Sequence, residues 1–218
     1  MVSDPRYRTF LETNTAEARP PLVPEIRLRL ATEITPLWQA TEIVLEKEGV
    51  PPPFWAFCWA GGQALARHVL DHPETVRGRR VLDFAAGCGV CGIAAALAGA
   101  KAVEGNEIDP VAMEAMSMNA ALNGVDLLPQ EGDVVGSLDR VWDVVLAGDV
   151  CYEKPLAERV IPWMRALAAR GTRVLIADPG RSYLPSQGLS ALATYSVPVS
   201  RELEDRDIRE TTVYALLP

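Results

Sequence analysis

The residues with the clearest chemical potential lie in one short loop at positions 81–92, VLDFAAGCGVCG. Its glycines Gly87, Gly89 and Gly92 have the G-x-G-x-x-G spacing with which dinucleotide-binding folds bring the backbone close to a pyrophosphate. The loop also begins with an acidic residue, Asp83, which suits the ammonium group of S-adenosylmethionine (SAM). The loop therefore predicts an adenosine-bearing cofactor contacted by Asp83, Gly87 and Gly89, and it leaves a nicotinamide dinucleotide and SAM as alternatives.

Two further carboxylates follow at positions where a nucleotide needs polar partners. Glu107 ends the second predicted strand, about 20 residues past Gly87, where a carboxylate can accept hydrogen bonds from both ribose hydroxyls. Asp133 follows the third predicted strand and can accept from an adenine amino group or serve as an ordinary turn aspartate. Asp109 is expected to cap the next helix. Glu107 does not distinguish the two cofactors, because both carry a ribose.

Asp149 and Tyr152 follow the next apolar strand at D-x-x-Y spacing, in the segment LAGDVCYE. The carboxyl ends of parallel strands face the cofactor crevice, where a charged side chain is costly unless it has a function. A hydride-transfer enzyme has no obvious use for an aspartate there, whereas a methyl-transfer enzyme must orient an acceptor nitrogen. We therefore predict that Asp149 and Tyr152 are catalytic, with capping of the next helix as the alternative for Asp149.

Alternating strands and helices must position these residues. Strands are predicted at 80–84, 102–108, 126–131, 141–149 and 172–180, and helices at 62–72, 90–97, 109–124 and 155–171. This βαβ repetition predicts a doubly wound parallel sheet. Two β-like runs at 192–203 and 211–218 have no full helix between them and must pair antiparallel. An α/β fold whose parallel sheet ends in an antiparallel strand pair is the Rossmann-like, seven-stranded methyltransferase arrangement, which favours SAM.

The part of the sequence before this repetition is predicted to be an extension. Residues 1–58 are expected to pack on the core as an N-terminal helix/strand extension, and residues 59–218 to form the methyltransferase domain. A helix is predicted over residues 1 to about 22, and the period-2 pattern of 25–34 predicts a strand or hairpin arm. Four aromatic side chains follow a run of prolines that starts at Pro51: Phe54, Trp55, Phe57 and Trp59.

Composition limits the class of protein. The sequence has 218 residues, 49% hydrophobic and 23% charged, which fits one globular domain. A formal net charge of -8 argues against a nucleic-acid-binding protein, because a phosphate backbone requires clustered Lys and Arg. No apolar stretch approaches the roughly 20 residues of a membrane span, and early acidic residues are unlike a mitochondrial presequence. We therefore expect a cytoplasmic protein without a membrane partner, with a monomer as the default oligomeric state.

The four cysteines do not predict a disulfide framework or a metal site. Cys88 and Cys91 form a C-x-x-C pair, but the sequence holds no second pair, and its two histidines lie on one predicted helix. We expect Cys88 and Cys91 to be small buried residues around a tight turn.

Five segments together resemble a known family: PFWAFCWAGGQALARHVLDHPETVRG, VLDFAAGCGVCGIAAALAGA, VEGNEIDP, LAGDVCYE and RVLIADPGR. In order and spacing they are similar to the lysine methyltransferases of the electron-transfer flavoprotein β subunit, a group of seven-stranded enzymes marked by D-x-x-Y. The resemblance runs from about Pro24 onward. It implies that Trp59 and the following Ala60-Gly61-Gly62 line the SAM site. Ala60 stands where relatives often have proline, and Glu107 where they often have aspartate.

We interpret the sequence as a SAM-dependent protein-lysine N-methyltransferase, with the electron-transfer flavoprotein β subunit as its expected protein substrate. The resemblance implies that Asp149 holds the lysine amine and that Tyr152, Trp55 and Trp59 form an aromatic channel for its stem. Gly180-Arg181 and the stretch 183–187 are candidates for part of the docking surface, with an ordinary loop as the alternative. A nicotinamide-dependent oxidoreductase and a small-molecule methyltransferase remain alternatives. The absence of an N-P-P-Y motif and of a basic stripe argues against a nucleic-acid substrate.

Overall fold

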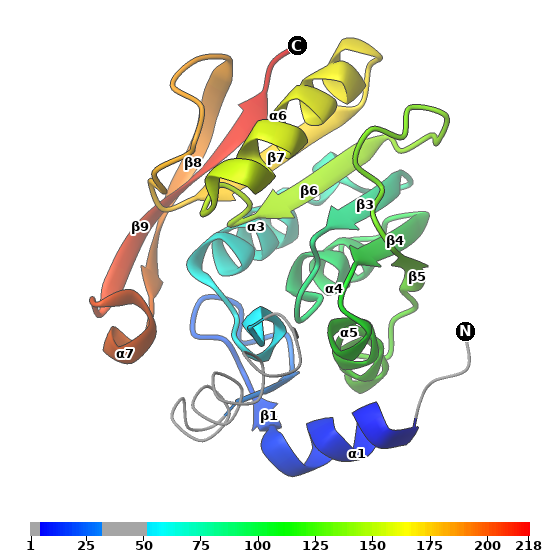
Figure 1. Ribbon diagram of the computed structural model, residues 1–218, viewed down its shortest axis with the longest axis vertical. Helices are drawn as coiled ribbons and strands as arrows, with labels where there is room; N and C mark the ends of the chain where they lie inside the picture. Colours follow the sequence, from blue (N-terminus) through cyan, green and yellow to red (C-terminus); the bar gives the residue numbers. More distant parts are fainter. Residues whose placement is uncertain (1–4, 32–51) are drawn as a thin grey trace.

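The computed structural model describes residues 5–31 and 52–218, and its centre is a seven-stranded sheet (Figure 1). The strands are β3 (Arg80–Phe84), β4 (Ala102–Glu107), β5 (Leu128–Glu131), β6 (Val144–Gly148), β7 (Arg173–Asp178), β8 (Leu189–Pro198) and β9 (Ile208–Leu216). Their order in the sheet is β5-β4-β3-β6-β7-β9-β8. From β3 the chain adds strands on one side, β4 and then β5, and it then returns to add β6 and β7 on the other side of β3. The switch point between β3 and β6 is where ligands bind in sheets of this kind.

The pairing confirms the predicted topology. β5, β4, β3, β6 and β7 are parallel neighbours, whereas β9 pairs antiparallel with both β7 and β8. The five predicted core strands are all present, although β6 is shorter than the segment 141–149 predicted for it. The Rossmann-like fold with a terminal antiparallel pair is therefore confirmed.

Helices cover both faces of the sheet. They are α3 (Ala60–Asp71), α4 (Val90–Leu97), α5 (Pro110–Leu122) and α6 (Lys154–Ala169), while the short α7 (Arg201–Glu204) lies in the connection between β8 and β9. Val144 and Leu146 of β6 point into a core shared with α3 and α4, while Val145 points into the opposite core shared with α6. Both faces of β6 are thus buried, which explains its uninterrupted apolar sequence. No helix among the described residues combines the length and apolar character needed to cross a membrane.

The first turns of α4 and α5 explain two features of the sequence. Asp109 caps α5, as predicted, because its Oδ1 accepts from the Val111 N–H at 2.8 Å. Gly89 precedes α4 with φ +80°, and a Cβ there would lie 2.8 Å from Cγ of Met116 on α5. Glycine at this position therefore permits both the left-handed turn and the close approach of two helices.

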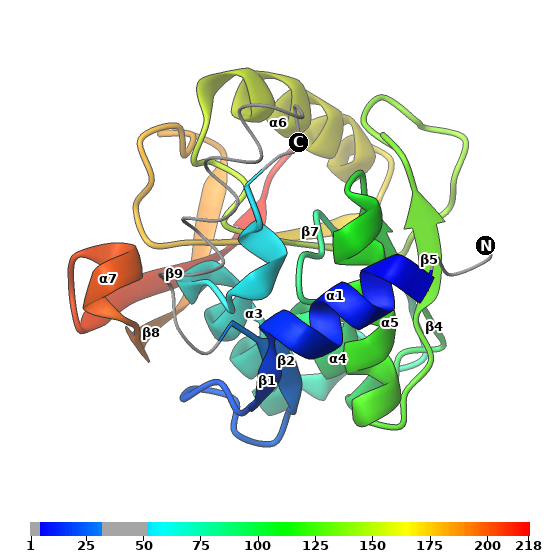
Figure 2. The same cartoon turned by 60° about the horizontal axis from the view of Figure 1, so that its bottom comes forward.

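The N-terminal segment packs on α5, as Figure 2 shows. It consists of α1 (Pro5–Asn14) and a short antiparallel pair, β1 (Ala16–Ala18) with β2 (Leu28–Leu30). The helix predicted to reach residue 22 ends at Asn14. Arg29 acts as its C-terminal cap, because its Nη2 donates to the Glu12 and Thr15 carbonyls at 3.3 and 3.0 Å. Residues 32–34 of the predicted strand, and Pro51, lie outside the described residues.

Two asparagines, one within α5 and one at its C-cap, attach this N-terminal segment to the core. Asn119 Oδ1 accepts from the Arg29 N–H at 2.7 Å, and Asn123 Oδ1 accepts from the Arg27 N–H at 2.9 Å. Leu11 of α1 belongs to the same hydrophobic cluster as α5. The described part of residues 1–58 is therefore joined to the helix that follows β4.

Candidate active site

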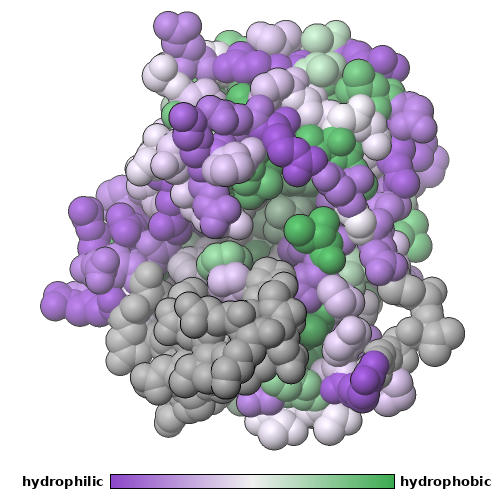
Figure 3. Space-filling model, viewed as in Figure 1, coloured by the Kyte–Doolittle hydropathy of each residue, from purple (hydrophilic) through white to green (hydrophobic). Residues whose placement is uncertain are grey.

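Apart from Trp59, which precedes α3, the predicted site residues lie at or after the carboxyl ends of adjacent parallel strands. Figure 3 shows hydrophobic side chains around a recess in the middle of this face, with hydrophilic side chains surrounding them. Tyr152 follows β6 and Glu107 ends β4. Burial, with the nearby charges of Glu153 and Glu107, raises the pKa of Tyr152 to about 12. The D-x-x-Y tyrosine and the predicted ribose ligand therefore follow two strands, β6 and β4, that lie on either side of β3.

The loop after β3 is shaped by left-handed backbone. Ala85, Gly87 and Gly89 have φ values of +50°, +53° and +80°. An L-residue pays roughly 1–2 kcal/mol for this conformation, so Ala85 is strained where glycine would not be. Its side chain is exposed. The loop thus presents small residues and backbone toward the crevice, as a closely held cofactor requires.

Glu107 bridges the end of β4 and the glycine loop. Its Oε1 accepts from the Gly87 N–H at 2.8 Å and its Oε2 from the Ile108 N–H at 3.1 Å. Burial raises the pKa of Glu107. Each carboxylate oxygen keeps a further lone pair, so the geometry fits two ribose hydroxyls as donors. Ile108, which sequence reasoning missed, is 69% exposed beside it.

Asp83 lies below the loop rather than open to the crevice. It is buried, and its Oδ2 accepts from the Gly92 N–H of α4 at 2.7 Å. A Cβ on Gly92 would lie 3.0 Å from the same oxygen. Burial raises the pKa of Asp83 to about 8. Asp83 therefore fixes the loop to α4, and its predicted contact with the SAM ammonium group stays a prediction.

We expect Asp83→Asn to flatten the pH dependence of stability. The folded protein keeps a proton on Asp83 that the unfolded chain loses above its ordinary pKa. The free energy of unfolding therefore falls between about pH 4 and pH 8, by up to about 1.4 kcal/mol per pH unit. Asn accepts the same hydrogen bond without titrating. Urea denaturation of the cofactor-free protein at several pH values measures the effect.

Asp133→Asn is the control for that experiment. Arg159 holds the pKa of Asp133 below its ordinary value, so this carboxyl stays ionised over the same pH range. Its substitution should leave the slope unchanged. Parallel profiles for the wild type and Asp83→Asn would contradict the assignment of a buried, protonated Asp83.

Asp133 follows β5 in an exposed turn. Its Oδ1 accepts from the Val135 N–H at 2.9 Å, and its Oδ2 pairs with Arg159 Nη2 at 2.5 Å. These contacts account for Asp133 as a turn residue. Its predicted contact with the adenine amino group stays a prediction.

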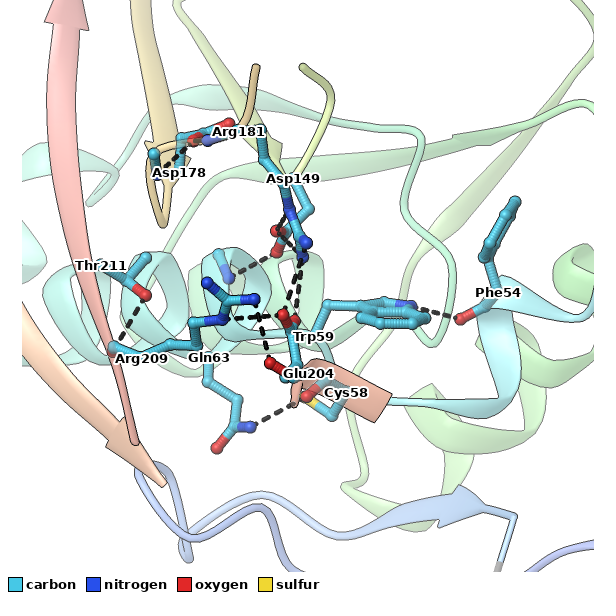
Figure 4. Close-up of polar contacts among 12 residues, drawn as sticks. Phe54, Cys58, Trp59, Gln63, Asp149, Asp178, Arg181, Glu204, Arg209 and Thr211 are labelled. Carbon is cyan, nitrogen blue, oxygen red and sulfur yellow. Dashed lines mark hydrogen bonds and ion pairs between the residues drawn. The ribbon is translucent and has the colours of Figure 1, made fainter. Parts of the chain in front are cut away.

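Asp149 is the most constrained residue of the site (Figure 4). Its backbone φ is +55°, and its side chain is 11% exposed. Oδ1 accepts from Arg181 Nε and Nη2 at 3.1 and 2.9 Å, and Oδ2 accepts from the Gly61 N–H in the first turn of α3. The alternative of capping the next helix is wrong, because its carboxylate binds the N-terminus of α3, whose helix dipole favours the negative charge.

The aromatic wall beside Tyr152 differs from the prediction. The Tyr152 ring lies 5.4 Å from that of Phe54, and Trp59 lies 6.1 Å from Phe54 and donates Nε1–H to its carbonyl at 2.9 Å. Tyr152 itself is 39% exposed. Trp55 is 4% exposed and packs against Phe10, so its predicted place in the channel is wrong. In the 3₁₀ turn Phe54–Ala56, the two neighbouring rings therefore have different partners: Phe54 lies by Trp59 and Tyr152, and Trp55 by Phe10.

Arg181 and Glu204 are site residues that the sequence did not identify in these roles. Arg181 was predicted to contribute to a docking surface, yet its guanidinium turns inward to Asp149 and Glu204 (Figure 4). A cavity of about 430 Å³ reaches Glu204 and Trp59 from the side of the N-terminal segment. No residue of the glycine loop lines this cavity.

The cysteines of the loop pack as small apolar residues. Cys88 and Cys91 are buried free thiols, as predicted, and Cys91 donates to the Gly62 carbonyl at 3.5 Å. Among the described residues, no group of three potential metal-ligating side chains converges.

Known proteins resemble this chain in sequence and in fold. The family model described as "Ribosomal protein L11 methyltransferase (PrmA)" matches residues 64–151. The crystal structure of a magnesium protoporphyrin IX methyltransferase from Synechocystis, with bound SAM, superposes with a TM-score of 0.52 at 17% identity, covering 71% of this chain and 79% of that one. A putative RNA methyltransferase from Pyrococcus horikoshii gives 0.53 at 18% identity, covering 83% and 98%. These likenesses concern the fold.

More similar sequences cover almost the whole chain. Proteins named "Electron transfer flavoprotein beta subunit lysine methyltransferase" are 40% identical in Xenopus laevis, over 97% of this chain and 87% of the relative, and 36% identical in Homo sapiens, over 99% and 84%. The Danio rerio relative is 40% identical over 88% of this chain and 76% of its own. The chain therefore belongs to the electron transfer flavoprotein beta subunit lysine methyltransferase family and is a SAM-dependent methyltransferase.

Proposed function

We propose that the enzyme methylates lysine side chains of an electron transfer flavoprotein beta subunit. The names of its relatives support this substrate. The observation that carries the proposal is the nearly buried carboxylate of Asp149 at the end of β6, held by two partners beside the partly exposed Tyr152. The relatives do not favour the oxidoreductase or the small-molecule methyltransferase that the sequence left open.

The residues of the crevice fit a bound SAM molecule. SAM supplies a methyl group on a positively charged sulfur. Gly87 and Gly89 let the backbone approach it, and Glu107 accepts from the ribose hydroxyls. Ile108, exposed beside Glu107, offers an apolar surface for the adenine ring. Trp59, at the start of α3, closes the side nearest Asp149.

Asp149 and Tyr152 would receive the lysine. A lysine amine has a pKa of about 10.4, so only about one in a few thousand is neutral near pH 7. The amine must lose its proton to solvent water before transfer, and a nearby sulfonium charge favours that loss. Asp149 holds the neutral amine by a hydrogen bond, while Tyr152 and Phe54 line the path of its stem. Orientation supplies most of the rate enhancement.

Incubation of the purified beta subunit with SAM and this enzyme tests the proposal. Mass spectrometry should show the beta subunit gaining whole methyl groups on lysine, and a reaction without enzyme should show none. Parallel titrations should show binding of S-adenosylhomocysteine and not of NADH. An unmodified beta subunit, with methyl groups on a small molecule instead, would contradict the proposal.

A further inference from the structure

Arg181 lies between two carboxylates at the edge of the crevice (Figure 4). Besides its two hydrogen bonds to Asp149, its Nη2 donates to Glu204 Oε1 at 2.9 Å. The Glu204 side chain is only 2% exposed, and that of Asp149 11%, so both charges are largely removed from water. A buried carboxylate that loses its partner is strongly destabilised. A planar guanidinium has several donors in fixed directions and can therefore donate to both carboxylates at once.

Further contacts anchor Arg181 from two sides. Asp178 Oδ1 accepts from the Gly180 and Arg181 backbone N–H groups at 2.7 and 2.6 Å, which fixes the turn after β7. Glu204 is held in turn by Arg209 of β9, whose Nε donates to Glu204 Oε2 at 3.0 Å. The guanidinium is therefore positioned by elements on both sides of it before any substrate arrives.

We propose that Arg181 is a positioning residue, which holds the Asp149 carboxylate in one orientation toward the incoming amine. The inference rests on the proposed function, in which Asp149 receives that amine. Arg181 occupies Oδ1 with two donors, and the Gly61 N–H occupies one lone pair of Oδ2. The second lone pair of Oδ2 is then the open acceptor. The direction of this lone pair is fixed by the hydrogen bonds from Arg181 and from the Gly61 N–H.

Arg181 also controls the charge of Asp149. Burial raises the pKa of Asp149 to about 6, Arg181 opposes that shift, and the charge of Asp178 adds to it. Three nearby thiols, Cys58, Cys91 and Cys151, have raised pKa values and stay neutral near pH 7. Hydrogen bonding to Cys88 and burial raise the pKa of Cys58, burial raises those of Cys91 and Cys151, and the charge of Asp149 adds to all three shifts. Without Arg181, Asp149 would bind a proton in the physiological pH range.

The test compares Arg181→Gln and Arg181→Lys with a matched control, Arg201→Gln. Arg201, the first residue of α7, pairs with Asp207 in an exposed ion pair, so this control removes the same charge without a contact to Asp149. The measured quantities are kcat and KM for the acceptor protein from about pH 5 to about pH 9 at saturating SAM. The Kd of S-adenosylhomocysteine is measured in parallel to establish that each variant folds.

Arg181→Gln should raise the pH of half-maximal kcat on the acid side by about one to three units. At pH 7 its kcat should fall, while the Kd of S-adenosylhomocysteine stays within about threefold. Arg181→Lys should move the acid limb back toward the wild type, because the charge returns. Its kcat should stay low, because a lysine ammonium does not reproduce the paired Nε and Nη2 donors of the guanidinium. Arg201→Gln should match the wild type.

Carbon NMR titration of the Asp149 carboxyl group, assigned against Asp149→Asn, gives a readout that needs no turnover. If Arg181→Gln leaves both this titration and the acid limb at the wild-type pH, the inference is wrong. If the titration shifts but the wild type does not methylate the acceptor, the proposed function alone fails. If the Arg181 variants do not fold, Glu204→Gln decides. Removing the competing carboxylate leaves the Arg181 charge to Asp149, so a shift of the titration and of the acid limb to lower pH supports the inference, and a wild-type profile overturns it.

Discussion

Asp149→Asn should lower kcat for lysine methylation by at least about a hundredfold while S-adenosylhomocysteine still binds. Asn can accept from Arg181 through Oδ1, but its Nδ2 then meets the Gly61 N–H, and two donors face each other. The side chain loses its charge and the acceptor that would hold the amine. Asn tolerates the left-handed backbone at φ +55°, so the backbone should keep its course. Steady-state methylation and calorimetric titration measure the two effects.

Asp143→Asn is the matched control for this substitution. Asp143 precedes β6, and its Oδ2 accepts from the Arg80 N–H at 2.7 Å at the opposite end of the sheet. It should therefore retain wild-type kcat. Asp149→Ala is less informative, because Ala adds roughly 1–2 kcal/mol of left-handed strain. Loss of S-adenosylhomocysteine binding in Asp149→Asn, or full activity, would show that Asp149 has another role.

Gly61→Ala should destabilise the protein and displace Asp149. A Cβ at this position would lie 2.5 Å from the Ala177 carbonyl oxygen and 2.7 Å from the Asp149 backbone nitrogen. Both are backbone atoms of neighbouring strand ends, so α3 must move away from the sheet. We expect the free energy of unfolding to fall by about 2–3 kcal/mol, with a parallel loss of kcat. Chemical denaturation and the methylation assay measure these changes.

The adjacent glycine provides the comparison. A Cβ at Gly62 would meet Val90 Cγ1 at 3.1 Å, which is the end of a side chain. Alanine also favours the helix by about 1 kcal/mol over glycine. Gly62→Ala should therefore be close to neutral in the free energy of unfolding. Equal losses of stability in the two variants would mean that the close approach of Gly61 to β6 and β7 has no special importance.

The strands and the glycine loop could be predicted because their signals are local. Continuous apolar runs mark strands that are buried on both faces, and Asp109-Pro110 marks the start of α5 within two residues. The position of Asp149 followed from the same rule, because a strand end fixes where the next residue lies. Element identity and the location of the site therefore came from short-range patterns.

The partners of Asp149 could not be predicted, because they come from distant parts of the chain. Arg181 is 32 residues away and Gly61 is 88 residues away in sequence. Their contacts depend on how β7 and α3 pack beside β6, which no local pattern encodes. Trp55 was misassigned for a related reason. Of two adjacent aromatic rings in one 3₁₀ turn, Phe54 lies beside Tyr152 and Trp55 is buried, and no local pattern tells the two apart.

β9 follows β8 in the chain but lies between β7 and β8 in the sheet. A ribosome therefore releases β8 before the strand that joins it to the rest of the protein. Until β9 has been made, the nascent chain carries an unpaired β8 and an open edge at β7, both of which invite aggregation. Glu204 and Arg209 emerge in the same late stretch. Sheet closure and the bracing of Arg181 thus both wait for the segment that follows β8 in the chain.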